Sequence, residues 1–158
     1  METAFRNLRR LPFATILAAR NYGMDNISVP ETAQSGAKLC MAILRGDNIE
    51  AQELLDEGCP LDHHDDPDGW TPLIYSIYYN NRRARNMLLS RGADISEPDY
   101  AMRTPLMFAA IRGDADLLSA LLCMGADPGQ TDYRGKSALD FAMEYHNRRC
   151  ADILMFHR

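Results

Sequence analysis

A short stretch of the chain, CPLDHHDDPDGW, concentrates residues that could do chemistry. It begins at the thiol of Cys59 and contains the adjacent imidazoles of His63 and His64, followed by the carboxylates of Asp65 and Asp66. These are zinc-binding groups, so a metal-dependent protein that uses His63, His64, Asp65 and Asp66 is one hypothesis. Metal ligands must converge, however, whereas neighbouring side chains of an extended segment point to opposite sides. We therefore expect no metal and no cofactor, and we favour a structural or partner-binding loop.

Other features of the sequence argue against an enzyme. It contains no nucleophile elbow, phosphate-binding loop, zincin helix or closely spaced cysteine pair. The four cysteines are far apart, which disfavours a disulfide framework and favours an intracellular, reducing compartment. A net charge of −5 argues against nucleic acid as the partner, because phosphate binding requires a basic surface. No apolar run approaches the roughly 18 residues of a transmembrane helix.

The elements that must position these residues recur along the chain. The phrase TPLIYSIYYNN begins at Thr71, TPLMFAAIRGD at Thr104 and SALDFAMEYHN at Ser137, at steps of 33 residues. Each unit predicts a pair of short antiparallel helices, because Thr71 and Thr104 can cap a first helix that opens with Pro72 or Pro105. The second helix of each unit is followed by a glycine suited to a left-handed turn. These glycines are Gly58, Gly92 and Gly125.

This order of features resembles the ankyrin repeat family. The matching pieces are DGWTPL, RTPLMFAAIRGD, RGADIS, MGADP and RGKSALDFA. The resemblance implies an all-α ankyrin repeat solenoid of helix-turn-helix units joined by β-hairpin fingers. It divides the chain into an N-terminal segment, 1–35, and a repeat domain, 36–158, with units at about 36–65, 66–98, 99–131 and 132–158. The first and last units resemble capping repeats, and Met102 stands where a turn glycine is usual.

The resemblance also implies where a partner protein would bind. The family binds partners through the finger tips and the exposed, concave face of each first helix. The matching positions that we predict to bind a partner are Trp70, Asp68, Tyr78, Tyr79, Tyr100, Arg103, Arg112, Tyr133, Arg134, Lys136 and Tyr145. Because Trp, Tyr and Arg dominate interface energetics, this set favours a binding surface. The alternative for Tyr78 and Tyr79 is packing between neighbouring units.

A second group of basic residues opens one of the second helices. Arg82, Arg83 and Arg85 lie there, and Arg148 and Arg149 occupy the places of Arg82 and Arg83 two units later. This group predicts either a solvated outer face or a patch for an acidic partner.

The first 24 residues have a different composition from the rest. They read METAFRNLRRLPFATILAARNYGM, with four arginines against Glu2 as the only acidic residue. This Arg-rich segment looks like a mitochondrial transit peptide, which favours a mitochondrial location, with the cytosol as the alternative. Pro12 interrupts the expected helix, so the second interpretation is a retained arm that docks on the first repeat or on a neighbouring subunit.

These observations predict a non-catalytic protein–protein interaction module. We expect a structural or accessory subunit of a larger assembly, because the domain is short and has no second module. The alternative is a free-standing cytosolic ankyrin adaptor or regulator in signalling.

Overall fold

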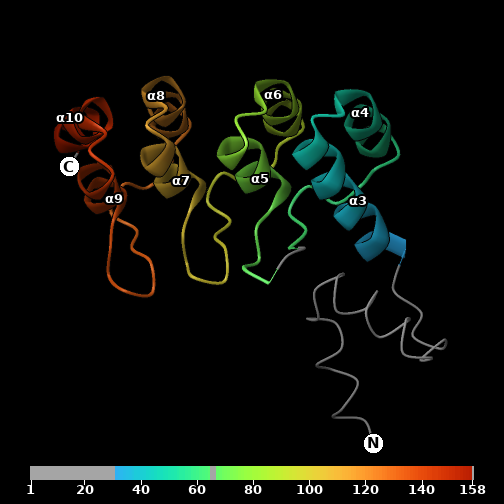
Figure 1. The fold of residues 1–158 in the computed structure, drawn as a ribbon, viewed down its shortest axis with the longest axis horizontal. Coiled ribbons are helices and arrows are strands. Elements are labelled where there is room, and N and C mark those ends of the chain that lie inside the picture. The colour runs from blue at the N-terminus through green and yellow to red at the C-terminus, as the bar shows by residue number, and fades with distance from the viewer. Residues whose placement is uncertain (1–30, 65–66, 158) are drawn as a thin grey trace, which may run out of the picture.

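The structure is a computed structural model that describes residues 31–64 and 67–157. Its helices form successive pairs that stand side by side in a row, with loops projecting from one edge (Figure 1). The helices are α3 (Glu31–Arg45), α4 (Asn48–Asp56), α5 (Pro72–Tyr78), α6 (Arg82–Ser90), α7 (Pro105–Arg112), α8 (Ala115–Cys123), α9 (Ala138–Glu144) and α10 (Arg148–Phe156). This arrangement confirms the predicted all-α solenoid of helix-turn-helix units. Helix α3 begins ahead of the expected unit boundary at residue 36.

The helix ends follow from local sequence. Thr71 Oγ1 accepts a hydrogen bond from the Ile74 amide at 3.3 Å, and Thr104 Oγ1 accepts one from the Met107 amide at 3.4 Å. Both predicted caps are therefore confirmed, and each is followed by a proline in the first turn. The predicted turn glycines are confirmed as well, since all of them have positive φ. These are Gly58 (φ 85°), Gly92 (φ 85°) and Gly125 (φ 99°).

The helices pack in two layers. The first helices of the units form one layer, in which α3 packs on α5, α5 on α7 and α7 on α9. In the second layer α4 packs on α6 and α8 packs on α10, whereas α6 and α8 make little contact with each other. The core lies between the layers and includes fully buried Leu73, Ile74, Leu88, Met107 and Leu118. The backbones of the second layer therefore approach one another least closely between the second and third repeats.

Side chains at the mid-unit turns tie neighbouring repeats together. Asn81 Nδ2 donates a hydrogen bond to the Ile43 carbonyl at 3.2 Å. Asn147 Nδ2 donates to the carbonyls of Ala110 and Ile111, at 2.7 and 2.9 Å. These bonds give the Ile43 and Ala110 carbonyls a second donor, because each also accepts from the amide of the glycine that ends its helix, Gly46 at 3.1 Å and Gly113 at 3.2 Å.

The fingers are closed turns. Asp99 Oδ1 accepts from the Arg103 amide at 2.7 Å, and Asp132 Oδ1 accepts from the Lys136 amide at 2.8 Å. The amide of each aspartate also donates back, to the Arg103 and Lys136 carbonyls at 3.0 and 2.9 Å. The described residues contain no β-strand, and the expected hairpin ladder is reduced to an isolated antiparallel bridge at the last finger.

One backbone position recurs in the fingers with positive φ. It is occupied by Gly69 (φ 74°), Met102 (φ 62°) and Gly135 (φ 77°). Met102 therefore adopts a conformation that disfavours residues with a Cβ atom. Neighbouring fingers are joined by single backbone hydrogen bonds, from the Tyr100 amide to the Asp68 carbonyl at 2.9 Å and from the Tyr133 amide to the Ala101 carbonyl at 3.1 Å.

Candidate partner-binding surface

An aromatic cluster lies where the finger before α5 meets α5 and α7. We define it as Trp70, Tyr75, Tyr78, Tyr79 and Phe108. The Trp70 ring centroid lies 5.5 Å from that of Tyr75, 4.7 Å from that of Tyr78 and 5.3 Å from that of Phe108. Tyr78 and Tyr79 contact each other edge to face at 5.3 Å. These separations are typical of favourable aromatic pairs, so the rings hold one another in place.

Exposure within the aromatic cluster is graded. Phe108 is buried, Trp70 and Tyr75 are half-buried, and Tyr78 and Tyr79 are 37% and 47% exposed. The two tyrosines therefore present apolar ring surface to solvent on a rigid base. This arrangement alone does not test whether Tyr78 and Tyr79 bind a partner or serve to pack neighbouring units, because both rings contact neighbours and both remain accessible.

Two of the predicted arginines border the aromatic cluster. The Arg103 guanidinium lies 5.0 Å from the Phe108 ring centroid, and that of Arg112 lies 5.9 Å from the Tyr78 ring centroid, both within the range of a cation–π contact. Arg103 is also paired with the buried carboxylate of Asp99 at 2.6 Å. The Arg103 guanidinium is thus paired with a carboxylate of its own finger. The Arg112 side chain, in contrast, is exposed.

The structure places the other predicted residues along the fingers and on the last repeat. Tyr100 stacks on His64, with ring centroids 5.5 Å apart and planes 9° from parallel. Arg134 Nε donates to the hydroxyl of the adjacent Tyr133 at 2.6 Å. Lys136 Nζ donates to Glu144 Oε2 at 2.7 Å, and this hydrogen bond raises the pKa of the Lys136 ammonium. The remaining two, Asp68 and Tyr145, are exposed.

The paired histidines of the opening motif have different surroundings. His64 Nε2 lies 3.0 Å from Glu97 Oε1 in the next repeat. His63 packs against the backbone of Gly36 in α3, where a Cβ atom would lie 2.4 Å from His63 Cγ. In residues 31–64 and 67–157 no three His, Cys, Asp or Glu side chains gather as metal ligands. Asp65 and Asp66 lie outside the described residues.

The basic group at the start of α6 contains residues of two kinds. Arg82 and Arg83 are exposed, whereas Arg85 is only 8% exposed. Arg85 Nη1 lies 3.4 Å from Oδ2 of Asp114, the residue that caps α8. Arg85 therefore does not belong to a solvated face, because its position in α6 directs it toward the next repeat.

Sequence reasoning missed two members of the aromatic cluster. Tyr75 lies three and four positions before Tyr78 and Tyr79, the spacing that places residues on one helical face. That spacing could have identified it. Phe108 had no such signal, because its contact with Trp70 crosses from one repeat to the next.

The predicted N-terminal arm lies outside the described residues, apart from residues 31–35 at the start of α3. Of the helices in the part of the chain that the structure describes, none combines the length and apolar character needed to cross a membrane.

Comparison with known protein families gives two matches. Residues 14–99 match the family described as ankyrin repeats (3 copies), and residues 102–133 match the single ankyrin repeat. The first match covers more than half of the chain. It begins at residue 14, inside the segment that was predicted as a separate arm.

Two relatives share part of this sequence. The chain is 35% identical over 79 residues to the 2-5A-dependent ribonuclease of Mus musculus, a match covering 50% of this chain and 11% of that protein. It is 44% identical over 43 residues to the putative ankyrin repeat protein FPV223 of Fowlpox virus (strain NVSL), covering 27% of this chain and 30% of that protein. The matched regions thus span less than a third of either relative.

Proposed function

This chain belongs to the ankyrin repeat family, and we propose that it is a non-catalytic module that binds a partner protein through the aromatic cluster and the adjoining fingers. The observation that carries this proposal is the pair of exposed rings, Tyr78 and Tyr79, held on the half-buried Trp70 and the buried Phe108. Ankyrin repeats are interaction modules, and a solenoid presents an extended surface to its partner.

The exposed tyrosines have the properties of interface hot spots. Tyrosine buries a large apolar area and loses little conformational freedom, since it has only two side-chain torsions. The ring contacts already restrict Tyr78 and Tyr79, so ordering them on binding costs less than ordering free side chains. A hot-spot residue costs about 2 kcal/mol or more when truncated to alanine, which corresponds to about a 30-fold loss of affinity.

We further propose that the module serves as an accessory subunit of a larger assembly. The Arg-rich first 24 residues resemble a mitochondrial targeting segment and support a mitochondrial location for this subunit. A free cytosolic adaptor is the competing role. Isolation of the tagged full-length chain from fractionated cells separates the two, because an adaptor would run mostly at its own mass of 17.8 kDa in the cytosolic fraction.

The test of binding uses a Tyr78→Ala/Tyr79→Ala variant of the full-length chain. Proteins that co-purify with the unchanged chain are identified by mass spectrometry, and the affinity of the recovered partner is then measured with purified protein. We expect the double variant to bind at least about 30-fold more weakly, with unchanged helical circular dichroism. Met124→Ala is the control, because Met124 is 50% exposed at the end of α8, away from the aromatic cluster.

Trp70→Ala is a less specific test, because Trp70 packs on buried Phe108 and its loss also weakens the junction between repeats. Equal affinities for the unchanged chain and the double tyrosine variant would refute the proposed surface.

A further inference from the structure

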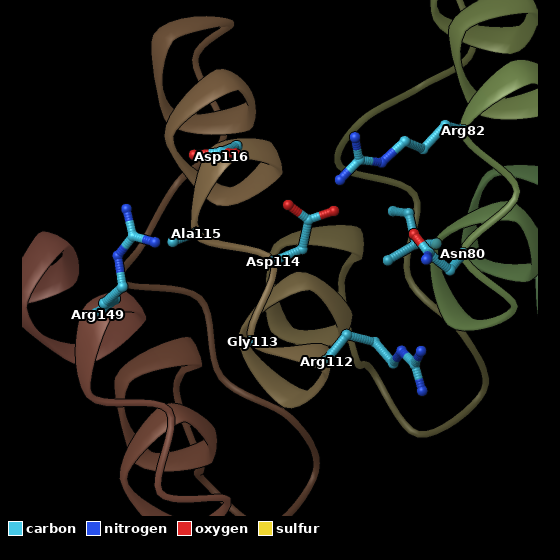
Figure 2. Close-up of a pocket in the computed structure, with 9 residues that line it drawn as sticks. Asn80, Arg82, Arg112, Gly113, Asp114, Ala115, Asp116 and Arg149 are labelled. Carbon is cyan, nitrogen blue, oxygen red and sulfur yellow. The ribbon is translucent and has the colours of Figure 1, made fainter.

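A polar groove opens at the mid-unit turns, where α6 and α8 make little contact. It has a volume of about 270 Å³, and its charged lining residues are Arg82, Arg112, Asp114, Asp116 and Arg149. Figure 2 shows that these side chains extend from α6, α7, the start of α8 and α10. The groove thus spans the second, third and fourth repeats.

The acidic residue at the centre of the groove is already engaged. Asp114 Oδ1 accepts a hydrogen bond from the Leu117 amide at 3.0 Å, and Oδ2 faces Arg85 Nη1 at 3.4 Å. In contrast, Arg82, Arg112 and Arg149 form no ion pair with any residue that the structure describes. Arg112 instead lies over the ring of Tyr78.

The local balance of charge is therefore positive in a chain whose net charge is −5. Four arginines (82, 85, 112 and 149) stand against two aspartates (114 and 116), an excess of two positive charges. An anionic group that enters the groove meets three guanidinium groups that form no ion pair with a described residue, and it must also tolerate the carboxylate of Asp116.

Stability does not account for two of these arginines. Arg82 and Arg149 lie in the first turns of α6 and α10, where a cation opposes the helix dipole. The other two second helices carry an acidic residue there, Glu50 in α4 and Asp116 in α8. Local departures from the arrangement that favours stability are expected at functional sites.

We propose that this groove binds an acidic segment of the partner protein, whose carboxylates are contacted by Arg82, Arg112 and Arg149. Guanidinium groups suit this role because they present paired donors that match a carboxylate. Arg112 connects the groove to the aromatic cluster, since it lines the groove and contacts Tyr78. This inference rests on the proposed function and adds the chemical class of the partner's docking segment.

The test uses the full-length chain and a fluorescein-labelled ten-residue peptide of alternating Glu and Ser. The same peptide with Gln in place of Glu is its neutral control, and binding is followed by fluorescence anisotropy. We expect Arg82→Gln/Arg149→Gln to weaken binding of the Glu peptide by about 5-fold or more, as expected for the loss of two exposed charge contacts. The neutral peptide should not bind measurably.

The matched control is Arg83→Gln/Arg148→Gln. It removes the same charge from the first turns of the same two helices, and both of its arginines are exposed and lie outside the groove. We expect it to weaken binding less than about 2-fold, because these exposed side chains do not line the groove and a solvent-exposed charge without a direct contact contributes little. Circular dichroism and urea midpoints are measured to check that each variant is folded.

Several outcomes would overturn the groove assignment. Equal losses of peptide affinity in the two double variants would show that the Glu peptide is attracted by the overall charge of the protein and not by the groove. Failure of the Glu peptide to bind at millimolar concentration would show that the groove is not a binding site. Preferential displacement of the peptide by inorganic phosphate at matched ionic strength would point to a phosphate site instead. If the partner is lost on Tyr78→Ala/Tyr79→Ala but bound normally by Arg82→Gln/Arg149→Gln, the proposed function stands and the groove proposal fails.

Discussion

The finger turns provide a test of backbone strain, because one structural position carries different residues. Gly69, Met102 and Gly135 follow one another at steps of 33 residues, and all have positive φ. We predict that Met102→Gly stabilises the protein, that Gly135→Ala destabilises it, and that Gly69→Ala destabilises it more.

The magnitudes follow from the surroundings of each residue. A side chain in the left-handed region costs about 1–2 kcal/mol, and glycine costs about 0.5–1 kcal/mol through the greater freedom of the unfolded chain. Met102 is 54% exposed and loses little packing, so Met102→Gly should stabilise by about 0.5–1 kcal/mol. A Cβ atom on Gly135 meets nothing within 4 Å, so Gly135→Ala should cost the same amount.

Gly69 differs because its space is occupied. A Cβ atom there would lie 2.5 Å from the ring of Tyr100, which also stacks on His64. The Tyr100 ring must move to make room for the Cβ atom. The free-energy cost of moving the ring therefore adds to the cost of the backbone strain. The loss for Gly69→Ala should therefore exceed that for Gly135→Ala.

Urea unfolding followed by far-ultraviolet circular dichroism measures these differences as shifts in midpoint at constant slope. A change of 1 kcal/mol corresponds to about 2–4 °C in melting temperature for a chain of this size. A destabilised Met102→Gly variant, or a Gly135→Ala loss as large as that of Gly69→Ala, would refute the reasoning.

Two further predictions concern buried polar groups. Arg85→Ala should lower the free energy of unfolding by about 1–3 kcal/mol, since it removes a mostly buried side chain and leaves Asp114 without its ion-pair partner. Arg85→Met should cost less because it keeps the packing, and equal losses measured by urea unfolding would contradict this. Iodoacetamide should label exposed Cys123 well before Cys59 and Cys150, because burial raises the pKa of the Cys59 and Cys150 thiols. Mass spectrometry measures the order of labelling, and early labelling of Cys59 would contradict this prediction. Because these pKa values are higher in the folded state, their contribution to stability is complete below the ordinary thiol pKa and is lost as pH rises through the folded-state pKa.

Features that depend on a few neighbouring residues could be predicted from the sequence. The Thr71 cap and the left-handed turn at Gly58 involve bonds within one turn of the chain, so residue type and spacing were sufficient. The 33-residue step then placed equivalent elements along the whole array. Met102 was identified in the same way, as a residue at a glycine position.

Contacts between repeats could not be predicted in this way. Arg85 was grouped with Arg82 and Arg83, yet it is buried because Asp114 lies opposite it in the next repeat. The hairpin ladder was expected from the resemblance, whereas the hydrogen bonds of Asp99 close the finger within five residues and leave no length for paired strands. Such outcomes depend on how units meet in space, which periodicity alone does not describe.

The hydrogen bonds between repeats have a consequence for recognition. At the turns, Asn81 reaches back to the carbonyl of Ile43, and at the fingers, the Tyr100 amide bonds to the Asp68 carbonyl. The turn bonds join the first repeat to the second and the third to the fourth, and the finger bonds join neighbouring fingers along another edge of the array. We expect bonds at both edges to limit bending of the joined repeats, so that a partner would meet a surface that needs little adjustment. Association should then resemble the meeting of two rigid bodies, with selectivity determined by shape as well as by individual contacts.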